Sequence, residues 1–211
     1  MTNTHPRIML QTPLRASDPR PRVELCVWRE QLLTDTNLPY SLIMGYTAGY
    51  PASSTRNKIA KLFLQSNADF LIMLDDDQWP LLPPRQFLDY VLLDYDVLGF
   101  PYPSLRINAA DPIPWYPSPP TALGAQEVDA VGTGAIIIAR RVLAAIPQPF
   151  TDVFDADGIF SEGEDLSFCR RAREHGFTIH CAFDKPVAHV KPANMLLLWG
   201  NPRWQKEAIM K

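Results

Sequence analysis

Short runs of apolar residues, each about the length of a strand, recur along the chain. The run Phe70–Leu74 contains no polar residue and predicts a strand buried on both faces. Two further runs, Val128–Val131 and Ala135–Ala139, flank the sequence Gly132-Thr133-Gly134. The remaining runs predict strands over Arg7–Gln11, Tyr40–Tyr46, Asp96–Phe100 and Ile179–Phe183.

Between these runs, apolar residues follow the period of an α-helix. In the first such segment, Val23, Cys26 and Val27 share the face that we expect to be buried. Strands that alternate with helices predict an α/β domain with a mostly parallel sheet and helices on both of its faces. The expected helices cover Val23–Leu33, a segment from Ser53 or Ser54 to Gln65, Arg85–Leu93, Arg140–Ile146 and a segment that ends before Gly176.

Proline interrupts this alternation in two places. The segment Pro101–Pro120 is rich in proline and is expected to be a long surface loop that carries Trp115 and Tyr116. A second irregular stretch is expected over Pro147–Gly158. With 211 residues the chain is long enough for one large α/β domain, and two small domains are the alternative. We expect a single domain over residues 1–211, with a nucleotide-binding part over about 1–100 and an acceptor and catalytic part over about 101–211.

Composition narrows the class of protein. With 46% hydrophobic and 20% charged residues the chain is expected to fold, and its net charge of −3 excludes a bulk positive field that would draw it to nucleic acid or a membrane. Cys26, Cys169 and Cys181 lack the spacing of metal ligands and are expected to be buried thiols in a reducing compartment. There is no apolar run of membrane-spanning length and no signal peptide, so a cytoplasmic location is expected.

Three consecutive aspartates, Asp75, Asp76 and Asp77, follow the buried run Phe70–Leu74 directly. Carboxylates that repel one another at the end of a buried strand cost stability unless a cation compensates them. Magnesium and manganese ions prefer such oxygen ligands, together with phosphate oxygens of a substrate. A solvated acidic turn without function is the alternative. Because ligands bind outside the carboxyl ends of parallel strands, the run marks a candidate site.

Other polar residues are candidates for the same site as the aspartate run. Arg56 and Asn57 lie near the start of a helix, where phosphate binds readily, although a solvated helix start is equally compatible. Glu162, Glu164 and Asp165 surround the start of a later helix as candidate general bases or as simple helix caps, and His189 is a candidate ligand or a structural histidine.

Taken together, the motifs LDDDQ, RN, GTGAIIIARR, SEGEDLSFCRRAREHG and a later histidine resemble a glycosyltransferase of the GT-A fold. The similarity covers roughly Arg7–Lys191 and is greatest to glycosyltransferase family 2 and its small phage or bacterial members. Each motif is weak alone, but their order and spacing are specific as a set. The resemblance implies a Rossmann-like sheet and a transferase, of the hexosyltransferase type, with a nucleotide-sugar donor such as a UDP-sugar.

The resemblance also implies roles around a divalent metal ion, Mn²⁺ or Mg²⁺. Asp77 would bind the metal that bridges the donor diphosphate, and Asp75 would lie near the ribose or support the metal through water. His189 would complete the metal shell. Asp76 would point away from the metal, because side chains alternate on an extended chain, and is expected to contact the donor.

The other implied donor contacts are Thr12, placed at the end of the first strand, together with Arg56 and Asn57. Gly134, in the segment Gly132–Gly134, would let the backbone approach the donor sugar.

Glu164-Asp165 resembles the ED pair of the family. Asp165 is the candidate base that removes a proton from the acceptor hydroxyl, with Glu162 and Glu164 as alternatives. A single in-line displacement would invert the anomeric centre, and a retaining outcome stays open.

The acceptor follows less directly from the sequence. Without a QxxRW motif or membrane helices, processive synthesis with export is not expected. A hydroxymethylated base in phage DNA is one candidate acceptor, contacted by Trp115, Tyr116 and a phosphate-binding face, and a surface glycan is another. That face would consist of arginines that are otherwise ordinary solvated positions, namely Arg140, Arg141, Arg170, Arg171 and Arg173.

Two other functions stay open at this point. A nucleotidyltransferase also uses carboxylates and a metal, but the segment QTPLRAS lacks the glycine of a phosphate loop. A sugar-nucleotide-binding module without catalysis would bind UDP without turnover.

Overall fold

The computed structural model describes residues 5–17, 19–102, 104–108, 111–115 and 124–190. The strands are β1 (Arg7–Arg15), β2 (Ser41–Gly49), β3 (Phe70–Leu74), β4 (Gln78–Pro80), β5 (Val97–Gly99), β6 (Ser104–Asn108), β7 (Asp111–Trp115), β8 (Ala125–Glu127), β9 (Ala135–Ala139), β10 (Val153–Phe154), β11 (Phe160–Glu162), β12 (Ile179–Ala182) and β13 (Val187–His189). The helices are α1 (Val23–Thr34), α2 (Ala52–Gln65), α3 (Pro84–Leu88), the 3₁₀-helix η1 (Asp89–Leu93), α4 (Arg140–Ala145) and α5 (Glu164–Glu174).

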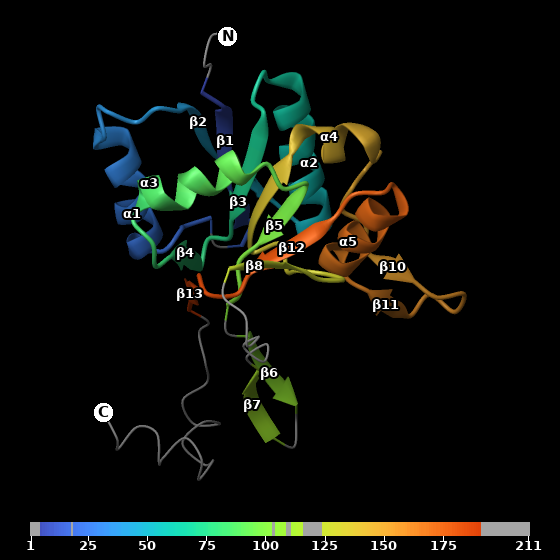
Figure 1. Cartoon of the computed structure of the whole chain (residues 1–211). Coiled ribbons are helices and arrows are strands. Elements are labelled where there is room, and N and C mark those ends of the chain that lie inside the picture. The colour runs from blue at the N-terminus through green and yellow to red at the C-terminus, as the bar shows by residue number, and fades with distance from the viewer. Residues whose placement is uncertain (1–4, 18, 103, 109–110, 116–123, 191–211) are drawn as a thin grey trace.

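A seven-stranded sheet with the order β2-β1-β3-β9-β5-β12-β8 forms the centre of the molecule (Figure 1). β1 pairs in parallel with β2 and β3, and β5 pairs in parallel with β12. β9 lies antiparallel between β3 and β5, and β8 is antiparallel to β12. Apart from β8 and β9, the strands of this sheet therefore run in one direction, which confirms the predicted mostly parallel arrangement.

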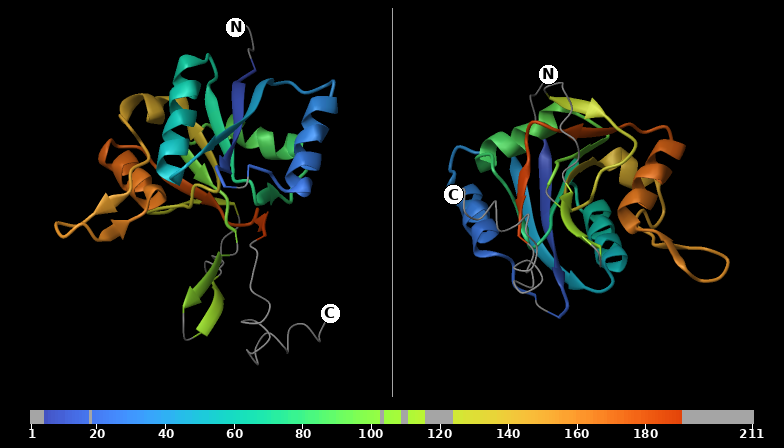
Figure 2. Two further views of the ribbon diagram at one scale, coloured as in Figure 1. Left: turned by 180° about the vertical axis from the view of Figure 1, so that it is seen from behind. Right: turned by 90° about the horizontal axis from the view of Figure 1, so that it is seen from below.

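Helices cover both faces of the sheet, as predicted. Seen from below in Figure 2, α1 and α3 lie on one face, and α2, α4 and α5 lie on the other. All five residues of β3 are buried, as expected for a central strand between two helical layers. The buried apolar residues of the sheet and the helices form one hydrophobic core.

Several local predictions were wrong. β1 continues to Arg15 rather than ending at Gln11, and α1 buries Leu25, Trp28 and Leu32, whereas Val23 is 72% exposed. The period of α1 was recognised, but its side chains admit two apolar faces, and packing selects the one with Trp28 and Leu32.

The proline-rich segment also differs from the expected loop, because β6 and β7 pair there as an antiparallel hairpin. Tyr116 lies outside the described residues. A strand edge tolerates proline where the ladder requires no N–H from it, so composition alone did not exclude strands here. In place of Val128–Val131, the strand before β9 is β8, three residues earlier.

The three cysteines are free thiols, with Cys169 and Cys181 buried and Cys26 partly buried. Within the described residues, the structure contains no helix of the length and apolar character that crossing a bilayer requires.

Candidate active site

Two cavities adjoin at the edge where β1, β2 and β3 end. The first, here called the strand-end cavity, has a volume of about 610 Å³, and the second, the arginine pocket, has a volume of about 550 Å³. Arg15 and Asp76 line both. The strand-end cavity is also lined by Pro13, Leu14, Ala16, Ser17, Gly49, Tyr50, Ala52, Thr55, Arg56 and Asp75. The arginine pocket is also lined by Arg20, Pro21, Arg22, Val23, Glu24, Asp77 and Val190.

The three aspartates lie in a turn that β3 delivers to this edge. The N–H of Gln78 donates to the carbonyl of Asp75 over 3.1 Å, and the N–H of Asp75 donates to the carbonyl of Gly134 over 2.8 Å. The chain is therefore not extended here, and the alternation that we expected for Asp76 does not apply. Instead of pointing away, Asp76 lines both cavities, and burial raises the pKa of its carboxyl group.

Arg56 is buried between two carboxylates. Its Nη1 and Nη2 bind the two oxygens of Asp75 at 2.9 and 3.1 Å, and its Nε lies 3.4 Å from Oε1 of Glu164. Burial acts to lower the pKa of Arg56, but Asp75 and Glu164 raise it more, so the guanidinium stays charged. Burial in turn raises the pKa of Glu164, an effect that Arg56 opposes. One cation thus links α2, β3 and α5 at the cavity floor.

Asp77 and His189 meet on the side of the arginine pocket. Oδ1 of Asp77 lies 3.5 Å from Nε2 of His189, and both side chains are less than a tenth exposed. β13 positions the histidine by pairing His189 opposite Gln78 in β4. Oδ2 of Asp77 accepts a hydrogen bond of 2.8 Å from Arg15.

The donor set at Asp77 and His189 fits a divalent ion of the kind expected. One carboxylate and one imidazole leave further positions for phosphate oxygens, as Mg²⁺ and Mn²⁺ usually require. Asp75 has both oxygens on Arg56, and the described part of the chain contains no group of three or more His, Cys, Asp or Glu side chains arranged to hold a metal. A metal here would therefore rest on Asp77, His189 and substrate oxygens.

Three of the predicted donor contacts lie elsewhere. Thr12 is fully buried inside β1, where its hydroxyl accepts a hydrogen bond from Arg29 over 2.7 Å. Asn57 exchanges two hydrogen bonds with the backbone of Phe150. A Cβ on Gly134 would collide with the side chain of Gln78, so this glycine serves close packing inside the protein. In place of Thr12, the residues Pro13–Ser17 reach the cavity, because β1 is longer than predicted.

The double hydrogen bond of Asn57 leads to a prediction. Asn57→Ala leaves the N–H and carbonyl of Phe150 without their partner, so the free energy of unfolding is expected to fall by about 1–3 kcal/mol. UDP affinity should not change. Urea denaturation and calorimetric titration measure the two effects, with Lys61→Ala, an exposed position on the same helix, as control. A loss of UDP affinity without a loss of stability would return Asn57 to the donor site.

The carboxylates around the start of α5 differ in their partners. Glu162 pairs with Arg170 at 3.0 Å, and Glu164 pairs with Arg56. Asp165 accepts the N–H of Leu166 over 2.8 Å and has no ion pair with the described residues. Asp165 is thus the acidic side chain of the three that is not held by an arginine.

Tyr102 was not predicted and joins several parts of the site. Its ring meets that of His189 edge-on, with centroids 5.1 Å apart, and a Cβ on Gly132 would collide with its hydroxyl. Burial raises the pKa of Tyr102 to about 12, and the nearby carboxylates of Asp75 and Asp165 raise it as well. The hydroxyl therefore stays protonated close to both acidic groups. The sequence contained a signal for this residue: Tyr102 follows β5 closely, just as Asp75 follows β3, and residues after strand ends are candidates for the site.

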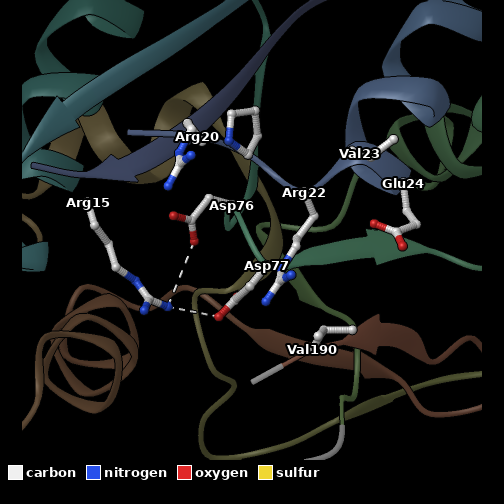
Figure 3. Close-up of a pocket in the computed structure, with 9 residues that line it drawn as sticks. Arg15, Arg20, Arg22, Val23, Glu24, Asp76, Asp77 and Val190 are labelled. Carbon is white, nitrogen blue, oxygen red and sulfur yellow. Dashed lines mark hydrogen bonds and ion pairs between the residues drawn. The ribbon is translucent and has the colours of Figure 1, made fainter. Parts of the chain in front are cut away.

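Arg15, Arg20 and Arg22 were also missed. Arg15 ends β1, Arg20 and Arg22 lie between β1 and α1, and Figure 3 shows the three side chains around Asp76 and Asp77. Three arginines close behind the first apolar run were a usable signal, but a strand predicted to end at Gln11 does not place Arg15 at a strand end beside the aspartates.

The arginines proposed to contact DNA are engaged within the protein. Arg140 donates to the carbonyls of Phe63, Ser66 and Ala68, and Arg171 donates to those of Pro147 and Gln148. The other three form ion pairs with carboxylates: Arg141 with Asp94 and Asp96, Arg170 with Glu162 and Glu174, and Arg173 with Asp129. The set offers no preformed face for phosphates.

Comparison with known proteins supports the fold. No protein-family model and no curated protein sequence matches the chain. The structure of A197 from STIV aligns with a TM-score of 0.55 at 20% identity, covering 88% of this chain and 86% of A197. TarS 1–349 from S. aureus, solved in complex with UDP-GlcNAc, aligns with a TM-score of 0.52 at 14% identity, covering 89% of this chain and 59% of that one. The chain thus has a glycosyltransferase-like, GT-A-type fold in a single domain.

Proposed function

We propose that this protein is a metal-dependent glycosyltransferase that moves a sugar from a nucleotide-sugar donor, preferably a UDP-sugar, to a hydroxyl group of an acceptor. The observation that carries the proposal is the strand-end cavity, where β1 and β2 end, α2 begins, and Arg56 and Asp75 form the floor. This is the edge of an α/β sheet at which nucleotides bind. The similarity to TarS, whose solved complex contains UDP-GlcNAc, is a second support.

The cavity suits a nucleoside. Leu14, Pro13 and Tyr50 give it apolar walls, and Asp75 provides carboxylate oxygens that a ribose hydroxyl can donate to. Asp76 and Arg15 stand where the cavity meets the arginine pocket. A nucleoside in the strand-end cavity would therefore direct its phosphates toward Asp77 and His189.

Negative charge builds on the diphosphate as it leaves. A divalent ion bound at Asp77 and His189 would supply Lewis-acid stabilisation of that charge. Arg15, 2.8 Å from Asp77, adds a guanidinium that can hold a phosphate through two hydrogen bonds.

Asp165 is the proposed base. Because Glu162 and Glu164 are each held by an arginine, Asp165 is the most available carboxylate at this end of α5 to accept the acceptor proton. The anomeric carbon would pass through an oxocarbenium-like state, and attack from the side of Asp165 would invert its configuration. The acceptor is proposed only as a group with a free hydroxyl.

The test is a screen of sugar nucleotides with Mn²⁺ that measures donor hydrolysis, and Asp77→Asn is the informative variant. We expect hydrolysis of a UDP-sugar to be stimulated by Mn²⁺ in the wild type and to lose this stimulation in Asp77→Asn. Asp94→Asn, a carboxylate on an exposed ion pair away from the cavities, is the control. Metal stimulation that survives at the wild-type level in Asp77→Asn would refute the metal assignment. UDP binding without any turnover would favour the binding-module alternative.

A further inference from the structure

The arginine pocket contains more positive groups than a bound cation needs. Arg15 is the last residue of β1, Arg20 and Arg22 come from the loop between β1 and α1, and Figure 3 shows all three gathered around Asp76 and Asp77. Arg22 forms no ion pair with the described residues through its side chain. Its backbone N–H donates to the carbonyl of Asp76 over 2.8 Å, which fixes the loop against the aspartate turn.

The start of α1 adds to the positive character of this pocket. The helix has twelve residues, and no side chain caps its first turn. Val23 and Glu24, its first two residues, line the pocket. The unsatisfied N–H groups of a first turn and the helix dipole both favour an anion. Guanidinium groups and a helix start thus share one wall.

The charges in the pocket balance as long as no ion is bound. The three arginines are matched by Asp76, Asp77 and Glu24. Arg15 itself serves as the counter-charge of the aspartates, at 2.8 Å from Asp77 and 3.9 Å from Asp76. Arg15 is about half exposed, so it can leave Asp77 without passing through the core. A divalent cation on Asp77 would replace Arg15 there and leave the pocket with excess positive charge.

We propose that the arginine pocket binds a phosphoryl group, and that a cation at Asp77 increases its affinity by releasing Arg15. The inference rests on the proposed function for the cation at Asp77, but the phosphoryl site itself depends on Arg20, Arg22 and the start of α1. Arginine suits phosphate because its planar group donates two parallel hydrogen bonds to it. The phosphoryl group belongs either to the diphosphate of the donor or to a separate phosphorylated ligand such as the acceptor.

The experiment is calorimetric titration of the full chain with inorganic pyrophosphate, with and without Mg²⁺. Because Mg²⁺ also binds pyrophosphate in solution, each variant is compared with the wild type in the same buffer. We expect the double variant Arg20→Gln/Arg22→Gln to bind about tenfold more weakly or worse, since hydrogen bonds to charged groups are the stronger ones. Arg141→Gln, whose partners Asp94 and Asp96 lie outside the pocket, should bind like the wild type.

Asp77→Asn tests the role of the cation separately. It removes the carboxylate that holds Arg15, so the gain in pyrophosphate affinity on adding Mg²⁺ should be smaller in this variant than in the wild type. Unchanged binding in the double arginine variant would overturn the phosphoryl site. A Mg²⁺ effect of wild-type size in Asp77→Asn would overturn the release of Arg15.

Competition identifies the source of the phosphoryl group. If UDP displaces pyrophosphate and uridine does not, the pocket holds the donor diphosphate. If UDP and pyrophosphate bind together, it holds a second phosphorylated ligand, and both results support the site. If pyrophosphate binds in an Arg20- and Arg22-dependent manner while no sugar nucleotide binds, the proposed function fails and the phosphoryl site stands.

Discussion

Arg56→Met is expected to lower the free energy of unfolding by about 3 kcal/mol at neutral pH, because it leaves two partly buried carboxylates without their buried counter-charge. Asp75 loses two hydrogen bonds and Glu164 loses its ion pair. Methionine fills most of the space of the arginine stem, so the loss reports on charge rather than on a cavity. Urea denaturation at pH 7 measures it.

The control is Arg7→Met, which removes an ion pair that is nearly half exposed on both sides. Exposed pairs contribute about 0–1 kcal/mol, so this variant should remain close to the wild type. Equal losses in the two variants would mean that Asp75 and Glu164 do not depend on Arg56.

The pH dependence of the Arg56→Met effect has a definite sign. Burial already raises the pKa of Glu164, and without the opposing charge of Arg56 the pKa of Glu164 should rise further. A group whose pKa is higher in the folded state contributes stability at low pH and loses it as pH rises through that pKa. The difference between variant and wild type should therefore shrink as pH falls toward about 4. A difference that does not change between pH 7 and pH 4 would contradict a charge mechanism.

Asp165→Asn is expected to lower kcat for sugar transfer by about 10²–10⁴-fold, the usual contribution of a general base. Affinity for UDP should not change, because the side chain lies outside the strand-end cavity. Asparagine keeps the size of the side chain and can still accept the N–H of Leu166 through its amide oxygen. Single-turnover kinetics separate binding from chemistry. The substrates are a UDP-sugar that the wild type hydrolyses and a hydroxyl-bearing acceptor to which the wild type transfers the sugar.

Glu162→Gln is the matched control for Asp165→Asn, since Glu162 is a neighbouring carboxylate that is bound to Arg170. It should retain transfer within a few-fold of the wild type. If Asp165→Asn still transfers sugar and Glu164→Gln does not, the base is Glu164. In that event the ion pair of Glu164 with Arg56 would have to open during the reaction.

The sequence predicted those features that depend on local pattern. The continuous apolar run Phe70–Leu74 indicated a central strand. The helical period of the apolar residues predicted α2 and α5. For α5, Gly176 also marked the end of the helix, and it has the positive φ typical of that position. The proximity of Arg56, Asp75 and Glu164 followed from the strand-end rule together with the family resemblance.

What the sequence did not predict depends on tertiary contacts. The end of β1 is set by its pairing with β2, which extends to Arg15. Because the predicted strand was shorter, Thr12 was placed at the strand end, and the arginines that follow it were not assigned to the site. Asn57 lies next to Arg56 on the helix, yet its partner Phe150 is more than ninety residues away in the sequence. No local pattern distinguishes an amide that holds a loop from one that holds a ligand.

The ion pairs of Arg56 also limit how the protein can move. α2, α5 and the turn after β3 meet on this one guanidinium, so a hinge motion that carried α5 away from the sheet would separate the buried Arg56 from the partly buried Glu164. Such a motion is costly, and α5 should therefore behave as part of the rigid frame rather than as a lid. Access for an acceptor then depends on the segments around α5, among them the β10–β11 hairpin, whose Phe154 and Phe160 are exposed beside it.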